Sequence, residues 1–206
     1  MSPGQPTPED LTPTAFIDRD SDVVKSFVEQ VAGDASDEHE VVARLFAAVR
    51  DGIRYDPYNV SGDPEDYRAS NVLRSDSGYC VQKSVALTAA ARAAGIPSRL
   101  GFADVKNHLQ SDRLKAAMGT DLFIWHGYST FFVGGHWTKA SCAFNAELCE
   151  RFGVAPLDFD GTQDALLHPY SGDGSQYMEY VNERGTYTDL PLEEMLTDLK
   201  ETYGRR

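Results

Sequence analysis

Cysteine is scarce in this sequence, and its spacing fits neither a disulfide framework nor a zinc site. The 206 residues contain three cysteines, Cys80, Cys142 and Cys149, an odd number with no CxxC motif. Disulfide-rich secreted domains use a dense and even set, and structural zinc sites use closely spaced pairs. The cysteine pattern therefore predicts no metal site, and it favours a reducing compartment.

Positive charge is in deficit, and long apolar runs are missing. Lys and Arg number 19 against 32 Asp and Glu, which gives a formal net charge of −13. Phosphate backbones and anionic membranes favour clustered basic side chains, so neither nucleic acid nor a membrane is an expected partner. No segment approaches the roughly 20 apolar residues of a membrane helix, and the N-terminus lacks the pattern of a secretory signal. We therefore expect a soluble, cytoplasmic protein.

The length predicts one domain preceded by a short tail. A chain of 206 residues can bury one sizeable core but is short for two complete domains. Residues 1–13 carry four prolines among small polar residues, which is typical of a disordered tail. Residues 14–206 are expected to form a single domain that ends in a helix. No repeat or glycine-rich phosphate loop is present, no cofactor is implied, and the oligomeric state is left open.

Hydrophobic periodicity predicts helices near both ends of the domain and strands between them. Apolar residues recur at helical spacing over 22–32, 36–52 and 192–203. The stripe on the last helix indicates core packing, with a partner-binding face as the alternative. Strand signals occupy 99–105 and the two sides of a Gly134-Gly135 pair. The sequence thus predicts an α+β fold.

The most distinctive stretch begins at Gly78-Tyr79-Cys80 and continues as a helix to Ala94. Gly95 and Pro97 are the stop signals expected after a helix C-terminus. Cys80 therefore lies at a helix N-terminus, where unpaired N–H groups and the helix dipole favour a thiolate. This position makes Cys80 a candidate nucleophile, and a buried structural cysteine is the alternative.

The Gly134-Gly135 hairpin predicts the surroundings of a candidate histidine. With these two glycines as the central turn residues, His126 lies opposite Ala143, and its diagonal neighbours on the same face are Ser141 and Asn145. Either diagonal side chain can hold the second ring nitrogen of His126, as a Cys–His site requires. Alternation places Trp137 on this face and Cys142 on the other, in the core.

These residues resemble the transglutaminase-like superfamily. The resemblance rests on Gly78-Tyr79-Cys80, on the helix ending in Gly95-Ile96-Pro97-Ser98-Arg99, and on His126 followed eleven residues later by Trp137, and it covers about residues 35–145. It implies a papain-like α+β fold, in which helices with a catalytic Cys at a helix N-terminus pack on an antiparallel sheet. Cys80 and His126 match the catalytic pair of the family.

The third catalytic position departs from the family pattern. The resemblance implies an Asp where this sequence has Ser141, which carries no charge to stabilise an imidazolium. Asn145 offers an amide oxygen, as asparagine does in papain-like proteases, and we favour it over Ser141. Asp158 and Asp160 stay open as further alternatives.

The resemblance implies a thiol enzyme that acts on a peptide or amide substrate. The Cys80 thiolate, generated by His126, would attack the carbonyl, and the thioester would be resolved by water in a peptidase or amidase, or by an amine in an acyltransferase. The backbone N–H of Cys80 would stabilise the oxyanion, with a second donor unassigned. Tyr79 and Trp137 are candidate substrate-binding residues.

Two other functions are compatible with the sequence. A degenerate papain-like module would bind peptides without turnover, and Ser141 in place of Asp is the best argument for it. An interaction domain would use the apolar stripe of the last helix instead.

Overall fold

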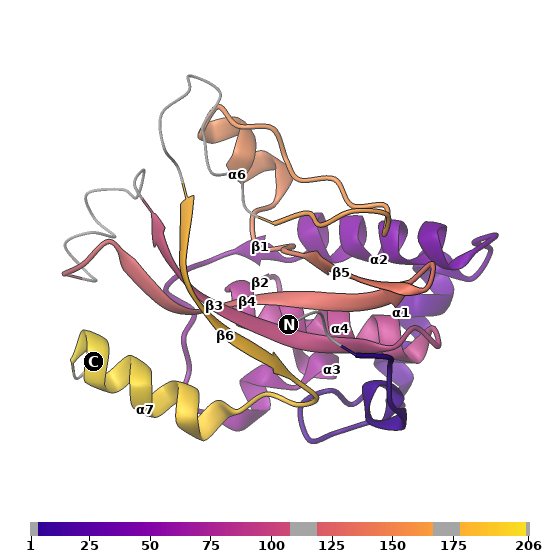
Figure 1. Cartoon of the computed structure of the whole chain (residues 1–206), viewed down its shortest axis with the longest axis horizontal. Coiled ribbons are helices and arrows are strands. Elements are labelled where there is room, and N and C mark those ends of the chain that lie inside the picture. The colour runs from indigo at the N-terminus through magenta and orange to yellow at the C-terminus, as the bar shows by residue number, and fades with distance from the viewer. Residues whose placement is uncertain (1–3, 108–118, 167–177, 205–206) are drawn as a thin grey trace.

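The computed structural model describes residues 4–107, 119–166 and 178–204, and it is an α+β fold in which helices cover one face of an antiparallel sheet (Figure 1). The predicted fold class is therefore confirmed. The elements in chain order are η1 (Pro8–Leu11), α1 (Asp22–Ala32), α2 (Glu38–Gly52), β1 (Arg54–Tyr55), η2 (Pro64–Tyr67), α3 (Ala69–Val72), β2 (Ser77–Gly78), α4 (Cys80–Ala93), β3 (Ser98–Asn107), β4 (Leu122–Val133), β5 (His136–Ala140), α6 (Ala146–Arg151), β6 (Met178–Tyr187) and α7 (Leu192–Tyr203).

The main sheet has four antiparallel strands in the order β5-β4-β3-β6. Val133 pairs with His136 across a turn in which Gly134 and Gly135 have φ values of 60° and 82°, a region that favours glycine. The predicted hairpin and its register are therefore confirmed. The second strand, however, ends at Ala140 and not at residue 145, because the next N–H, of Ser141, donates to the carbonyl of Ala165.

Helix α4 is buried on all sides, between the sheet and the helices α1, α2 and α3. Of its 14 residues, 13 are buried, and most of them are small or β-branched, which lets the strands approach closely. The predicted central helix is thus confirmed. Its burial on every face positions Cys80, its first residue, inside the protein.

The flanking helices also form where periodicity predicts them. The side chain of Asp37 caps α2 by accepting from the backbone N–H of Glu40 at 2.9 Å. On α7, Leu192 and Met195 are buried against the same apolar cluster as Cys80, so the stripe packs on the core. Within the described ranges, no helix combines the length and apolar character needed to cross a bilayer.

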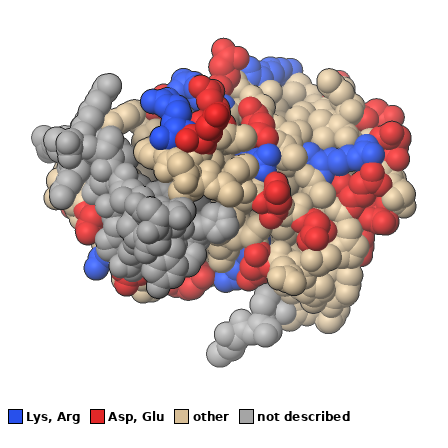
Figure 2. All heavy atoms as spheres, turned by 90° about the horizontal axis from the view of Figure 1, so that it is seen from above, with Lys and Arg blue, Asp and Glu red and all other residues tan. Residues whose placement is uncertain are grey.

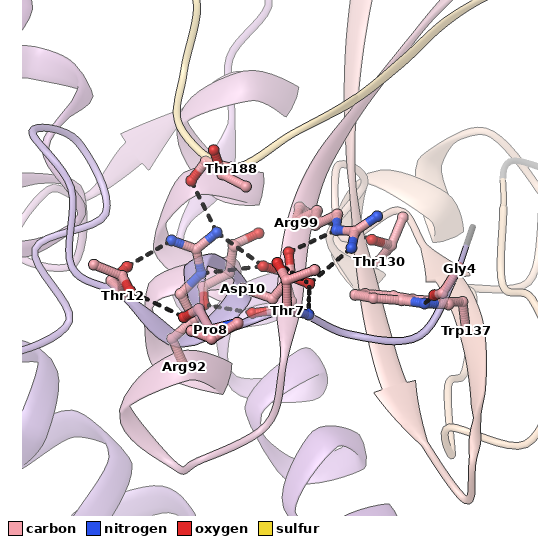
Figure 3. Close-up of polar contacts among 12 residues, drawn as sticks. Gly4, Thr7, Pro8, Asp10, Thr12, Arg92, Arg99, Thr130, Trp137 and Thr188 are labelled. Atoms are coloured by element: carbon pink, nitrogen blue, oxygen red, sulfur yellow. Dashed lines mark hydrogen bonds and ion pairs between the residues drawn. The ribbon is translucent and has the colours of Figure 1, made fainter.

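The N-terminal segment differs from the disordered tail expected for residues 1–13. From Gly4 onward the segment is described, and it includes the short helix η1 (Figure 3). Asp10 is fully buried and pairs with Arg99 of β3 at 2.6 Å, while Arg92 of α4 donates to the carbonyl of Thr12 at 2.8 Å. These distant partners order a segment whose composition alone resembles a disordered chain.

Charged side chains of both signs share the surface of the domain. On the face drawn in Figure 2, Lys and Arg lie beside Asp and Glu. Arg44, for example, forms ion pairs with Asp34 and Glu40, both at 2.5 Å.

Candidate functional site

Cys80 is the first residue of α4, and the side chain of Gln82 caps the start of this helix. The backbone N–H of Tyr79, the N-cap residue, donates to the side-chain oxygen of Gln82 at 3.1 Å. Cys80 is only 7% exposed, and it contributes to the wall of a cavity of about 570 Å³. The helix start thus presents the thiol to this cavity.

His126 reaches the same cavity from β4, because Gly127 lets this strand touch the first turn of α4. A Cβ atom at Gly127 would lie 2.9 Å from Cα of Val81 and 3.2 Å from the carbonyl oxygen of Cys80. The backbone N–H of Gly127 donates toward the Cys80 sulfur and lowers the pKa of the thiol. Cys80 and His126, the two predicted residues, therefore line one cavity.

The second ring nitrogen of His126 faces Ser141 rather than Asn145. Nε2 of His126 lies 3.3 Å from Oγ of Ser141. The amide oxygen of Asn145 instead accepts from the backbone N–H of Tyr55 at 3.2 Å. The expectation of Asn145 rested on a strand through residue 145, whereas β5 ends at Ala140 and it is Ser141 that contacts the ring.

The other candidates for the third catalytic position, Asp158 and Asp160, contact other residues. The carboxylate of Asp158 pairs with Arg50 at 3.1 Å, and that of Asp160 accepts from the hydroxyl of Thr162 at 2.7 Å. Cys142 is fully buried in a core cluster that does not include Cys80, which confirms it as a core residue.

Burial decides the charge state of the Cys–His pair. It raises the pKa of Cys80 to about 11, against the lowering effect of backbone N–H groups from Gly127, Val81 and Cys80 itself. Burial also lowers the pKa of His126 to about 4. The helix N-terminus was expected to favour a thiolate, but desolvation outweighs it, and the pair at neutral pH is an uncharged thiol and an uncharged imidazole.

Lys83 is a buried cation near the site that the sequence analysis did not single out. It lies one helical turn after Cys80, and its ammonium donates to the carbonyls of Arg50 and Ile53 at 2.8 and 2.6 Å, where α2 ends. Burial lowers the pKa of Lys83 to about 8, and its charge lowers the pKa of Cys80. The sequence feature that could have revealed Lys83 is a single lysine in a helix rich in alanine.

The residue before His126 has an unusual backbone conformation. Trp125 has a φ of 59°, in the left-handed region, at a bulge where the pairing of β4 with β3 shifts between Ala103 and Val105. Such bulges re-aim side chains and are frequent beside functional sites. The bulge therefore determines how His126 enters the cavity.

A polar network from three other elements holds Trp125 in place. Its backbone N–H donates to Asp104 of β3 at 3.1 Å, and its indole N–H donates to Asp198 of α7 at 2.8 Å. Arg184 of β6 lies over the indole ring at 4.6 Å and pairs with both carboxylates. Periodicity could not reveal this network, because its members come from distant segments.

The two predicted substrate-binding residues lie in different places. Tyr79 lines the cavity, and its hydroxyl contacts that of Tyr67 at 3.2 Å. Trp137 stacks on Arg99 at 4.4 Å, and its indole N–H donates to the carbonyl of Gly4 at 2.6 Å (Figure 3). Trp137 pairs with a β4 residue six positions beyond His126, which is about 20 Å along a strand. Trp137 therefore lies away from the cavity that Cys80 and His126 line.

Among residues 4–107, 119–166 and 178–204, no three His, Cys, Asp or Glu side chains are placed to hold a metal ion.

The fold and the site together define a papain-like domain, with a buried cysteine at a helix N-terminus and a histidine on the adjacent strand. The family model of the transglutaminase-like superfamily matches residues 25–142, which is more than half of the chain. The chain therefore belongs to the transglutaminase-like superfamily, as the resemblance predicted. A search of curated proteins finds no match.

The solved structures that are similar to the chain include the following three. A candidate cysteine protease from Cytophaga hutchinsonii has a TM-score of 0.52 and 15% identity, over 87% of this chain and 46% of that one. A candidate protease from Parabacteroides distasonis has a TM-score of 0.41 and 21% identity, over 61% and 25%. The periplasmic domain of TgpA from Pseudomonas aeruginosa has a TM-score of 0.44 and 18% identity, over 58% and 41%. The chain spans less than half the length of each of these chains.

Proposed function

We propose that this protein is a cysteine-dependent acyl-transfer enzyme that cleaves or transfers an amide or peptide acyl group through a thioester on Cys80. One observation carries the proposal: Cys80 and His126 line one cavity while Ser141 contacts the far ring nitrogen of His126. A nucleophile, a base and a group that orients the base are the parts that such chemistry needs.

The uncharged resting pair fixes the order of proton transfers. With the Oγ of Ser141 accepting from Nε2–H, the other ring nitrogen of His126 is free to take the thiol proton as the Cys80 sulfur attacks the carbonyl. The imidazolium then protonates the leaving amine, and a thioester forms. Water or an amine attacks the thioester, His126 removes its proton, and the thiol is restored. Water gives a protease or amidase, and an amine gives an acyltransferase.

The backbone N–H of Cys80 is the proposed oxyanion donor. It belongs to the first turn of α4, where N–H groups have no partner within the helix. One positioned donor of this kind typically lowers the barrier by about 3–4 kcal/mol.

An activated ester tests the proposal without knowledge of the natural substrate. We expect a p-nitrophenyl ester to leave an acyl group on Cys80, detected by peptide mass mapping, and His126→Ala to slow this acylation at least 100-fold. Ser141→Ala should slow it more than Asn145→Ala does, because Ser141 contacts the ring. Acylation spread over several residues, or unaffected by His126→Ala, would contradict the proposal.

The alternative is a degenerate module that binds peptides without turnover. It is favoured by the hydroxyl of Ser141 at the position where the family has a carboxylate, which leaves an imidazolium without a countercharge there. This alternative predicts peptide binding in the cavity without any acyl intermediate on Cys80.

A further inference from the structure

The cavity beside Cys80 and His126 is bordered by unusually exposed apolar side chains. Among the described residues, four large hydrophobic side chains are exposed, and three of them, Tyr58, Val60 and Phe152, line this cavity. Large apolar side chains that gather at the mouth of a pocket mark a binding site for an apolar ligand. Further apolar side chains also line the cavity, including Phe123, Phe144, Met195 and Leu199.

The charge of the lining differs from that of the chain. The chain has 32 acidic residues, yet no described Asp or Glu lines the cavity, and Lys200 is the one Lys or Arg among its described lining residues. Lys200 is exposed on α7, one turn beyond Leu196, which also lines the cavity. The wall is thus apolar, with a cation at its edge.

We propose that the cavity selects an acyl donor with a large apolar side chain, aromatic or branched aliphatic, that carries a carboxylate at the outer end near Lys200. The inference rests on the proposed function, because it assigns this cavity to the acyl group that Cys80 would accept. A volume of about 570 Å³ is within the range of sites that enclose a small-molecule ligand, and it exceeds the needs of one side chain. A polar amide side chain such as glutamine would lose hydration against this mostly apolar wall, which costs free energy that an apolar side chain does not pay.

Binding to the Cys80→Ala variant tests the inference separately from the chemistry. The probes are N-succinyl-phenylalanine amide, N-acetyl-phenylalanine amide and N-acetyl-glutamine amide, titrated by calorimetry. We expect the phenylalanine amides to bind about 10- to 100-fold more tightly than the glutamine amide, because an aromatic side chain is buried. Equal or weaker binding of the phenylalanine amides would overturn the inference, whereas failure of acylation in the wild type would leave this result intact.

A pair of lysine variants tests the carboxylate. The succinyl probe should bind a few-fold more tightly than the acetyl probe, in line with a surface ion pair, and Lys200→Met should abolish this difference. Lys25→Met is the control, because Lys25 is also exposed but lies on α1 outside the cavity lining. A difference that persists in Lys200→Met would overturn the role of Lys200.

A cavity-filling variant tests whether the probes bind in this cavity or at another surface of the protein. Leu196→Trp should weaken binding of the phenylalanine probes at least tenfold while the variant still unfolds cooperatively. Unchanged binding would place the probes elsewhere and overturn the inference. Dimers in light scattering that are not dissociated by the probes would instead show that a second copy covers this face, which also overturns it.

Discussion

The indole nitrogen of Trp125 donates to the carboxylate of Asp198 at 2.8 Å, although the two residues are 73 positions apart. Trp125 has a left-handed backbone and immediately precedes His126, so this contact couples the helix α7 to the candidate base. A non-glycine residue in this conformation costs roughly 1–3 kcal/mol, and it persists only where its surroundings hold it.

We expect Asp198→Ala to slow acylation of Cys80 about tenfold with little change in substrate binding, because the ring of His126 is then less firmly positioned. Trp125→Phe keeps the apolar ring but removes the N–H donor, and it should have a similar effect. The double variant should be little worse than Asp198→Ala alone, because both single variants remove the contact between Trp125 and Asp198. The control is Glu201→Ala, an exposed change on the same helix. An effect of Asp198→Ala no larger than the control would show that α7 does not position His126.

Gly127→Ala should destabilise the protein and disable the site. The added methyl group would meet backbone atoms of Val81 and Cys80, which cannot move aside as a flexible side chain would. We expect a loss of about 1–3 kcal/mol in the free energy of unfolding, together with acylation slowed at least tenfold. Gly52→Ala is the matched control, since a Cβ there meets nothing within 4 Å, and it should change stability by about 1 kcal/mol or less. Equal effects of the two variants in urea denaturation would contradict the close approach of β4 and α4.

The alkylation of Cys80 by iodoacetamide should be slow at neutral pH. With a pKa of about 11, only about one Cys80 in ten thousand is a thiolate at pH 7, compared with a few per cent for an ordinary thiol. We expect the rate, followed by peptide mass mapping, to rise as the pH increases toward 11. Fast alkylation below pH 8.5 that is lost in His126→Ala would show a resting ion pair and contradict the uncharged one.

Stability should fall as the pH falls from about 6.5 to about 4, in part because of His126. Burial lowers the pKa of His126 to about 4 in the folded protein, so the unfolded chain binds a proton first as the pH decreases. We expect His126→Gln to reduce this pH dependence, measured by urea denaturation at several pH values. His136→Gln changes an exposed residue and should retain it. An identical pH dependence in wild type and His126→Gln would argue against the buried, uncharged ring.

Asp10→Asn should destabilise the protein by about 3–5 kcal/mol, because it leaves Arg99 without its buried countercharge. Burial alone would raise the pKa of Asp10, but hydrogen bonds from Arg99 and Thr7 outweigh it and lower this pKa. Its contribution should therefore be present above pH 4 and lost as the pH falls through the lowered value. Asp34→Asn is the control, since its side chain is 87% exposed in its pair with Arg44, and it should cost less than about 1 kcal/mol. A cost of Asp10→Asn as small as that of the control would contradict an ordered N-terminal segment.

The sequence predicted the parts of the site that depend on local signals. Gly95 and Pro97 delimited the helix of Cys80, and the Gly134-Gly135 turn fixed the register of β4 and β5, because both signals act within a few residues. The third position was predicted less well: alternation along an assumed strand favoured Asn145, but hydrogen bonding of Ser141 to Ala165 ends the pairing first.

Long-range contacts account for the remaining differences. The ordered N-terminal segment depends on Arg92 and Arg99, and the conformation of Trp125 depends on β6 and α7. No local pattern encodes such partners. The cytoplasmic location, the single domain and the catalytic roles stay predictions.

The attachment of α7 also limits the fraction of molecules in which His126 is positioned to act. The hydroxyl of Tyr203 donates to the carbonyl of Leu122 and accepts from the N–H of Ile124. Helix α7 therefore holds the backbone of β4 just before His126. A helix with few buried residues, here Leu192 and Met195, can detach at a lower free energy than global unfolding requires. The equilibrium for detachment of α7, rather than that for unfolding, would then set the fraction of molecules with a positioned His126. Apparent affinity for any ligand that needs this state would decrease by the same fraction.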